Sequence, residues 1–137
     1  MKKNNKGFSL VELIIVIAIM AILAGALAPA LIKYINKSRA SADISNADTV
    51  RSAIQTALSN EDAMVAAPAT AQSYNISSLL DQSQYSTFSK ELSSILGDKT
   101  DIKGKYYGKG SEFKVYLDTG NNKVAVFGAD GSQLSPQ

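Results

Sequence analysis

A long apolar run near the N-terminus, interrupted by one carboxylate, constrains this 137-residue chain more than any other feature. From Phe8 to Ile32 nearly every residue is apolar or small, and Glu12 lies inside the run. A helix of this length, at ~1.5 Å per residue, reaches ~37 Å and can cross a hydrocarbon core of ~30 Å. A carboxylate within such a helix costs roughly 2.5–3.5 kcal/mol on insertion scales, so Glu12 marks a candidate functional site.

The charged residues indicate which end of this segment would face the cytoplasm. The chain has 14 basic and 12 acidic residues, and three of the lysines, at positions 2, 3 and 6, precede the apolar run. Such a basic tip is typical of the cytoplasmic side of a membrane segment. The rest of the chain has no basic excess, so we expect no specific nucleic-acid surface. The absence of cysteine and histidine excludes disulfides, Cys/His zinc sites and histidine acid–base catalysis.

Two ordinary interpretations of the N-terminal segment are an excised secretory signal peptide and a plain membrane anchor. "MKKNNK" fits a basic signal-peptide start, and "AGALAPA" (24–30) offers Ala-x-Ala cleavage sites. However, a signal-peptide apolar region is usually ~7–15 residues long, and this run is longer. A plain anchor explains the length but leaves Glu12 without a partner.

A third interpretation supplies that partner. Lys6 and Gly7 precede "FSLVEL" (8–13), and this arrangement closely resembles the class III signal peptide of type IV prepilins. The resemblance implies cleavage between Gly7 and Phe8 by a membrane prepilin peptidase, with residues 1–7 as the leader. It also implies N-methylation of Phe8. In the assembled filament, the Glu12 carboxylate of one subunit would pair with the Phe8 amine of another.

Physical chemistry favours the same pairing. Each of two opposite charges is costly alone in a low-dielectric helix core, but together they attract strongly. Entry into a filament would relieve the cost of an unpaired Glu12 and fix the register between subunits.

A helix break is expected further along the apolar run, at Gly25 and Pro29. Proline removes a helical hydrogen bond and clashes with the carbonyl four residues before it, which is that of Gly25. The resemblance implies unwinding of this region on assembly, although the family's glycine usually lies further upstream, where this chain has Ala21. A simple proline kink is the alternative.

The remainder of the chain is expected to form a water-exposed head. Apolar residues spaced three and four apart, from Ile44 to Leu58, predict that the helix continues to about Leu58 with an amphipathic second half. The polar residues Asp43 and Asp48 are assigned to the other faces. Residues 63–73 are expected to be a loop, "ISSLLDQ" (76–82) a short helical turn, and 86–97 a helix capped by Ser86 or Thr87 and ended by Gly97.

The C-terminal third predicts an antiparallel meander of three or four strands. "SEFKVYLD" and "KVAVFG" alternate around turn residues, and "KYYGKG" (105–110) is a further candidate strand. The expected fold class is therefore α+β and pilin-like, with a long helix packed on a small antiparallel sheet. The predicted parts are the leader 1–7, a membrane and filament-core helix 8–32, and a head 33–137. Within the head, a connecting region covers 59–102 and the sheet covers 103–134.

Few residues of the head suggest chemistry. "VYLDTG" resembles an aspartic-peptidase motif, but a second Asp-Thr-Gly or Asp-Ser-Gly is missing, and a hairpin turn explains it better. Asp118 and Asp130, with Asn121 and Asn122, are calcium-ligand candidates, and turn chemistry is the default interpretation. We expect no enzyme activity and no cofactor.

The expected function is that of a structural subunit of an extracellular type IV pilus. Its partners would be other copies of itself, prepilin peptidase, the pilus assembly platform with its motor, and the membrane before assembly. The chain would first span the cytoplasmic membrane once, with its leader in the cytoplasm, and later lie in the pilus. The alternatives are a pseudopilin of a type II secretion or competence system and a membrane-anchored binding domain that never polymerises.

Overall fold

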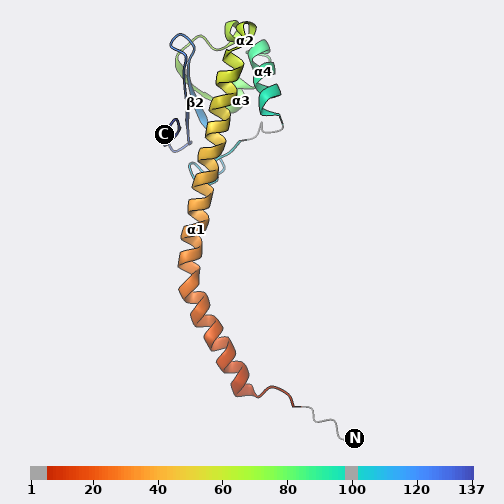
Figure 1. Ribbon diagram of the computed structural model, residues 1–137, viewed down its shortest axis with the longest axis vertical. Coiled ribbons are helices and arrows are strands. Elements are labelled where there is room, and N and C mark those ends of the chain that lie inside the picture. Colours follow the sequence, from red (N-terminus) through yellow and green to blue (C-terminus); the bar gives the residue numbers. More distant parts are fainter. Residues whose placement is uncertain (1–5, 98–101) are drawn as a thin grey trace, which may run out of the picture. The chain divides into compact units, whose positions relative to one another are not determined.

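The computed structural model describes residues 6–97 and 102–137. The chain divides into an N-terminal unit, Met1–Lys37, and a C-terminal unit, Ser38–Gln137. One helix, α1 (Leu10–Leu58), contributes to both units (Figure 1). Most of the predicted leader, residues 1–5, lies outside the described residues.

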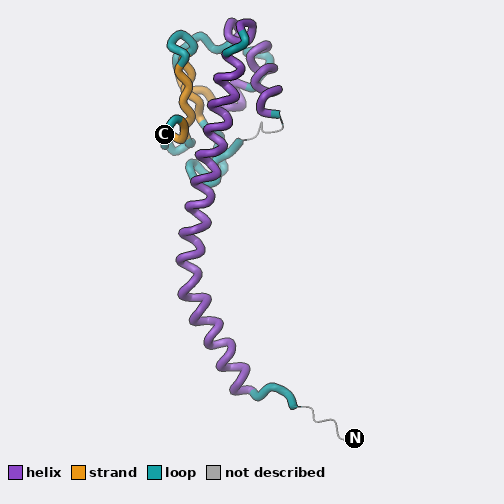
Figure 2. Tube along the Cα trace, in the orientation of Figure 1, coloured by secondary structure: helices purple, strands orange, loops and turns teal. Residues whose placement is uncertain are grey.

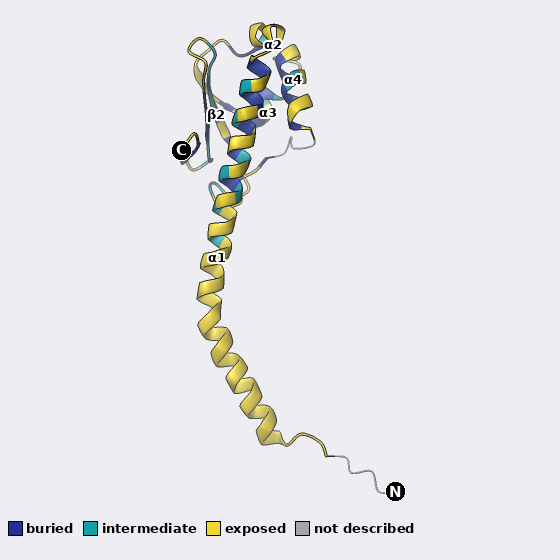
Figure 3. Cartoon of the chain, in the orientation of Figure 1, coloured by how far each residue is buried: buried dark blue, intermediate teal, exposed yellow. Residues whose placement is uncertain are grey.

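The described part of the N-terminal unit consists of a short extended segment and the first part of α1. Every residue from Lys6 to Ile35 is exposed, including the large apolar side chains (Figure 3). The helix is apolar all round here, so no single face is available to pack on a soluble core. This surface requires lipid or other apolar helices around it.

The C-terminal unit places short helices and a sheet around the last part of α1 (Figure 2). In Figure 1 the sheet lies on one side of this part of α1 and α4 lies on the other. Its further helices are α2 (Glu61–Ala66), α3 (Ile76–Leu79) and α4 (Ser86–Leu96), and its strands are β1 (Gln72–Asn75), β2 (Lys114–Asp118), β3 (Lys123–Phe127) and β4 (Gln133–Ser135).

The four strands form one antiparallel sheet in the order β1-β2-β3-β4. Tyr74 pairs with Val115 and Tyr116 pairs with Ala125, so β2 has a partner strand on both edges from residue 114 to 117. Strand β4 is short and pairs only with the end of β3, where Val126 lies opposite Ser135. The first half of β3 therefore has no β4 partner.

One hydrophobic core joins the helices to the sheet. The buried stripe of α1 follows the predicted spacing of three and four residues. The alternate residues of β2 enter the same core, since the side chains of a strand point to opposite faces in turn. The core contains Val50, Ile54, Ala57, Leu79, Phe88, Leu92, Phe113, Val115, Leu117, Val126 and Leu134.

The structure confirms the predicted α+β fold with a long N-terminal helix and a small antiparallel sheet. It also confirms the short helix after Asn75, the helix ending at Gly97, and strands at 114–118 and 123–127. Gly97 has a positive φ of 59°, which glycine adopts more readily than other residues.

Three local predictions were wrong. Residues 105–110 form turns instead of a strand, and residues 63–73 contain most of α2 and the start of β1 instead of a plain loop. Helix α4 has Tyr85 at its N-cap position without a side-chain cap, so neither Ser86 nor Thr87 caps it. Strand β1 thus comes from the region expected to connect helix and sheet.

Candidate processing and assembly site

The start of α1 is closed by a reciprocal pair of hydrogen bonds between Ser9 and Glu12. The backbone N–H of Ser9 donates to Glu12 Oε2 at 2.9 Å, and the N–H of Glu12 donates to Ser9 Oγ at 3.2 Å. This is a capping box, which satisfies two of the amides that a helix start leaves unpaired. Glu12 therefore stabilises the helix start within its own chain, a role that the Ser-x-x-Glu spacing could have revealed.

The predicted cleavage residues lie immediately before this cap and are accessible. Gly7 is exposed, and a Cβ built on it would meet nothing within 4 Å. The Phe8 side chain is 92% exposed. The structure thus places Gly7, Phe8 and Glu12 together at one accessible helix end. Their cleavage, methylation and charge-pairing roles stay predictions.

The helix that follows this end is the membrane candidate of the chain. Among the described residues, α1 is the one helix long and apolar enough to span a membrane, by its length and composition. Its most apolar window is not buried inside the protein. The core helix of a soluble protein would normally be mostly buried, and this segment is not.

The structure shows no helix break at Gly25 or Pro29. Helix α1 continues through both residues, with Pro29 inside it. A proline costs a helix one hydrogen bond and a clash, and long helices tolerate this when strong helix formers such as alanine and leucine flank it. Unwinding on assembly therefore stays a prediction about the filament.

The two calcium-ligand candidates are not brought together. Asp118 ends β2 opposite Lys123, at the start of β3, whereas Asp130 follows the other end of β3. Each carboxylate instead closes its own turn, accepting hydrogen bonds from Asn121 and from Ser132 respectively. Among the described residues, no group of three or more Asp, Glu, His or Cys could hold a metal ion. The two carboxylates therefore do not form a joint calcium site, and both make the turn contacts of the default interpretation.

The Asn121 contacts also affect the acidity of Asp118. The Asn121 side-chain amide, followed by its backbone N–H, stabilises the carboxylate and lowers the pKa of Asp118 below its usual 3.8. Ser83 lowers the pKa of Asp81 in the same way, first through its hydroxyl and then through its backbone N–H. Both effects are those expected of turn residues.

One acidic residue that the sequence analysis placed on a polar face is fully buried. Asp43 accepts hydrogen bonds of 2.7–3.0 Å from the backbone N–H groups of Lys105, Tyr106 and Tyr107. These amides belong to the turn that was expected to be a strand. Asp43 lies four residues before Ala47 on the buried stripe, so its spacing was the signal that could have identified it.

Comparisons with known proteins agree with the N-terminal pattern. A family model described as the prokaryotic N-terminal methylation motif matches residues 2–28. A type IV major fimbrial protein FimA of Dichelobacter nodosus is 45% identical over 58 residues, which cover 42% of this chain and 37% of the relative. A second FimA of that organism is 45% identical over 56 residues, covering 41% and 36%.

The likeness is confined to one part of each protein. The chain spans little more than a third of the length of the curated relatives that it matches. No solved structure was found to match the chain. The N-terminal segment of this chain therefore matches the prokaryotic N-terminal methylation motif, and its predicted resemblance to type IV pilins is confirmed.

Proposed function

We propose that this chain is a structural subunit of a type IV pilus and has no catalytic role. The observation that carries this proposal is the N-terminal methylation motif joined to an apolar helix that nothing in the described chain covers. A membrane can cover this helix before assembly, and the helices of other copies can cover it afterwards. The naming of the similar proteins as major fimbrial proteins supports a pilus over a secretion or competence pseudopilin.

The proposal includes a defined maturation. Prepilin peptidase removes residues 1–7 on the cytoplasmic side and methylates the new amine of Phe8. The mature chain spans the cytoplasmic membrane once until the assembly platform and motor transfer it to the extracellular filament. In the filament, the Glu12 carboxylate forms an ion pair with the Phe8 amine of a neighbouring subunit. The accessibility of Gly7 and Phe8 supports the proposed cleavage between them.

Intact mass and N-terminal sequencing of the native protein test the maturation. We expect a chain that starts at N-methylated Phe8. A chain that starts near Ala30 would identify an ordinary signal peptide, and a chain that keeps Met1 would identify a plain anchor. Either result would overturn the proposed processing.

Electron microscopy of the native cell surface tests the assembly. We expect filaments that antibodies against the C-terminal unit decorate along their length. Correct processing without decorated filaments would instead favour the alternative of a membrane-anchored binding domain that does not polymerise.

A further inference from the structure

A cavity of about 570 Å³ lies beside β3 in the C-terminal unit, outside the processing and assembly site. Its size falls within the range of small-molecule sites, roughly 300–1,000 Å³. Arg51 and Gln55 of α1, Tyr116 of β2 and Lys123 of β3 contribute to its lining. Two lining residues are basic, and no acidic residue lines it in the described part of the chain. The cavity therefore favours an anionic ligand.

Arg51 is held in place for such a ligand. Its side chain is half-buried, and its Nε donates to the Val124 carbonyl at 3.2 Å. This bond leaves the two terminal nitrogens of the guanidinium without an acidic partner among the described residues. Terminal guanidinium nitrogens in a fixed plane suit a carboxylate, which can accept two parallel hydrogen bonds from them.

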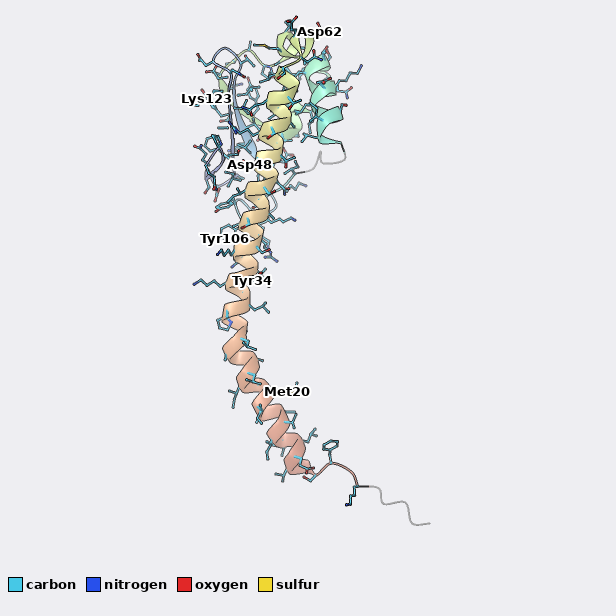
Figure 4. The ribbon with its side chains drawn as sticks, viewed as in Figure 1. Met20, Tyr34, Asp48, Asp62, Tyr106 and Lys123 are labelled. Atoms are coloured by element: carbon cyan, nitrogen blue, oxygen red, sulfur yellow. The ribbon has the colours of Figure 1, made fainter. Side chains whose placement is uncertain are left out.

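The second cation of the cavity lies over an aromatic ring. Lys123 Nζ is 5.8 Å from the centre of the Tyr116 ring, a cation–π distance. Lys123 is exposed and lies on the side of the unit away from α4 (Figure 4). Tyr116 is half-buried and contributes to the cavity lining. An aromatic ring in this position offers an apolar surface to a flat ligand.

Side-chain amides complete the lining. Gln55 and Asn122 have no side-chain hydrogen bond among the described residues, and Asn121 uses its amide nitrogen on Asp118 but keeps its oxygen. Each amide can both donate and accept, as each hydroxyl of a sugar can. Several amides beside an aromatic ring and a guanidinium therefore match a ligand that carries many hydroxyl groups and a carboxylate.

We propose that this cavity binds an acidic saccharide, with the carboxylate of a uronic acid-type sugar on Arg51 and its ring beside Tyr116. An acidic peptide is the competing ligand. An added peptide strand would have to pair with the first half of β3, beyond β4, and the Arg51 side chain already bonds to β3 there. The geometry thus favours the sugar. All the residues that line this cavity lie in the C-terminal unit, outside the N-terminal segment that carries the methylation motif.

Isothermal titration calorimetry of the full chain in neutral detergent tests the proposal. Tetragalacturonate is the probe, and the neutral tetragalactose and the peptide tetraglutamate are the comparisons. We expect saturable binding of tetragalacturonate and at least tenfold weaker binding of both other ligands. Absence of saturable binding, or equal binding of tetragalactose, would overturn the site. Equal or tighter binding of tetraglutamate would replace the sugar with a peptide and overturn the proposed ligand class.

Two variants assign the binding to the cavity. Arg51→Gln and Lys123→Gln should each weaken tetragalacturonate binding about tenfold or more, because each removes a charged contact. Lys90→Gln on α4 removes the same charge from an exposed position outside the cavity and should leave binding unchanged. Lys123 is exposed, so its variant remains informative if Arg51→Gln unfolds. Unchanged binding in a folded Lys123→Gln variant would overturn the assignment.

Discussion

The buried carboxylate of Asp43 shows how one residue can determine a local structure. Its carboxylate accepts hydrogen bonds from the backbone N–H groups of residues 105–107, which are not paired with a strand. Hydrogen bonds to a charged acceptor are stronger than neutral ones. The turn is further constrained by Gly104, where an added Cβ would clash with the Tyr107 carbonyl oxygen. Asp43 therefore fixes the turn that "KYYGKG" adopts.

Asp43→Asn should destabilise the C-terminal unit by roughly 3 kcal/mol, because the amide removes the charge and turns a donor toward the three N–H groups. Thermal unfolding followed by near-UV tyrosine circular dichroism measures this loss. Hydrogen exchange at residues 105–107 should accelerate in the same variant. Asp62→Asn, an exposed change of the same kind, should alter stability by no more than ~0.5 kcal/mol. Equal effects of the two changes would refute the role of Asp43.

Glu12 completes a capping box in its own chain and has a proposed charge-pair role in the filament, and two substitutions distinguish the two. Glu12→Gln keeps a side chain that can complete a capping box but removes the charge. Ser9→Ala removes the cap and keeps the charge. We expect filament assembly to fail in Glu12→Gln and to persist in Ser9→Ala, with normal membrane insertion in both. Filament yield in cells and membrane fractionation measure the two outcomes. Normal filaments from Glu12→Gln would rule out the charge pair.

At the scale of elements, apolar periodicity predicted the helices and strands whose conformation does not depend on contacts with distant residues. The alternation of Phe113, Val115 and Leu117 identified β2, and the spacing of Phe88, Leu92 and Leu96 identified α4. Strand β1, "QSYN", is polar and extended only because it pairs with β2. The turn at 105–110 has the aromatic composition of a strand, but Asp43 binds its amides from 62 to 64 residues away. Neither contact is visible in local sequence.

The candidate site could be predicted to a similar extent. The pattern around Gly7, Phe8 and Glu12 is local, and its position at the start of an exposed helix agrees with expectation. The separation of Asp118 from Asp130 depends on the sheet register, which composition does not specify. The cavity beside β3 is lined by residues of α1 and of the sheet, which are far apart in the sequence, so no short stretch of sequence could show it.

The β2–β3 hairpin allows an electrostatic prediction. Asn121→Ala should raise the pKa of Asp118 toward 3.8, because the largest cause of its lowering is the Asn121 side-chain amide. A folded-state pKa below the unfolded value stabilises the fold above the unfolded pKa, and this contribution is lost as pH falls through the folded pKa. The variant should therefore lose part of the stability that the Asp118 carboxylate contributes above its unfolded-state pKa, and the two proteins should be equally stable at pH values below the folded-state pKa. Carbon-13 NMR titration of the Asp118 carboxyl measures the shift, and the Asp81 carboxyl, held by Ser83, should titrate unchanged.

At the scale of the whole molecule, the two units differ in how their apolar side chains are shielded from water. The C-terminal unit buries a core of its own, whereas the N-terminal unit leaves its apolar side chains exposed to their surroundings. A helix that crosses a bilayer satisfies its backbone hydrogen bonds internally and needs no core. The stability of the first part of α1 should therefore depend on the lipid or detergent and not on the sheet.

Phe88→Ala tests this independence. Phe88 is fully buried, and truncation of such a side chain costs about 3–5 kcal/mol. The variant in micelles should lose near-UV tyrosine signal at a much lower temperature, while hydrogen exchange over residues 13–23 stays slow. Simultaneous loss of protection in both units would contradict their independence. Val65→Ala, which truncates an 89% exposed side chain, is the matched control and should change neither measurement.

The distance along the chain between Asp43 and its amides has a consequence for biogenesis. During synthesis from the N-terminus, Asp43 is made long before residues 105–107. Its carboxylate therefore has no hydrogen bonds from these three amides until they have been made. Contacts of such separation form late, because a long loop must first close. If α1 enters a membrane as proposed, it can therefore do so before the Asp43 turn has closed and before the C-terminal unit has folded.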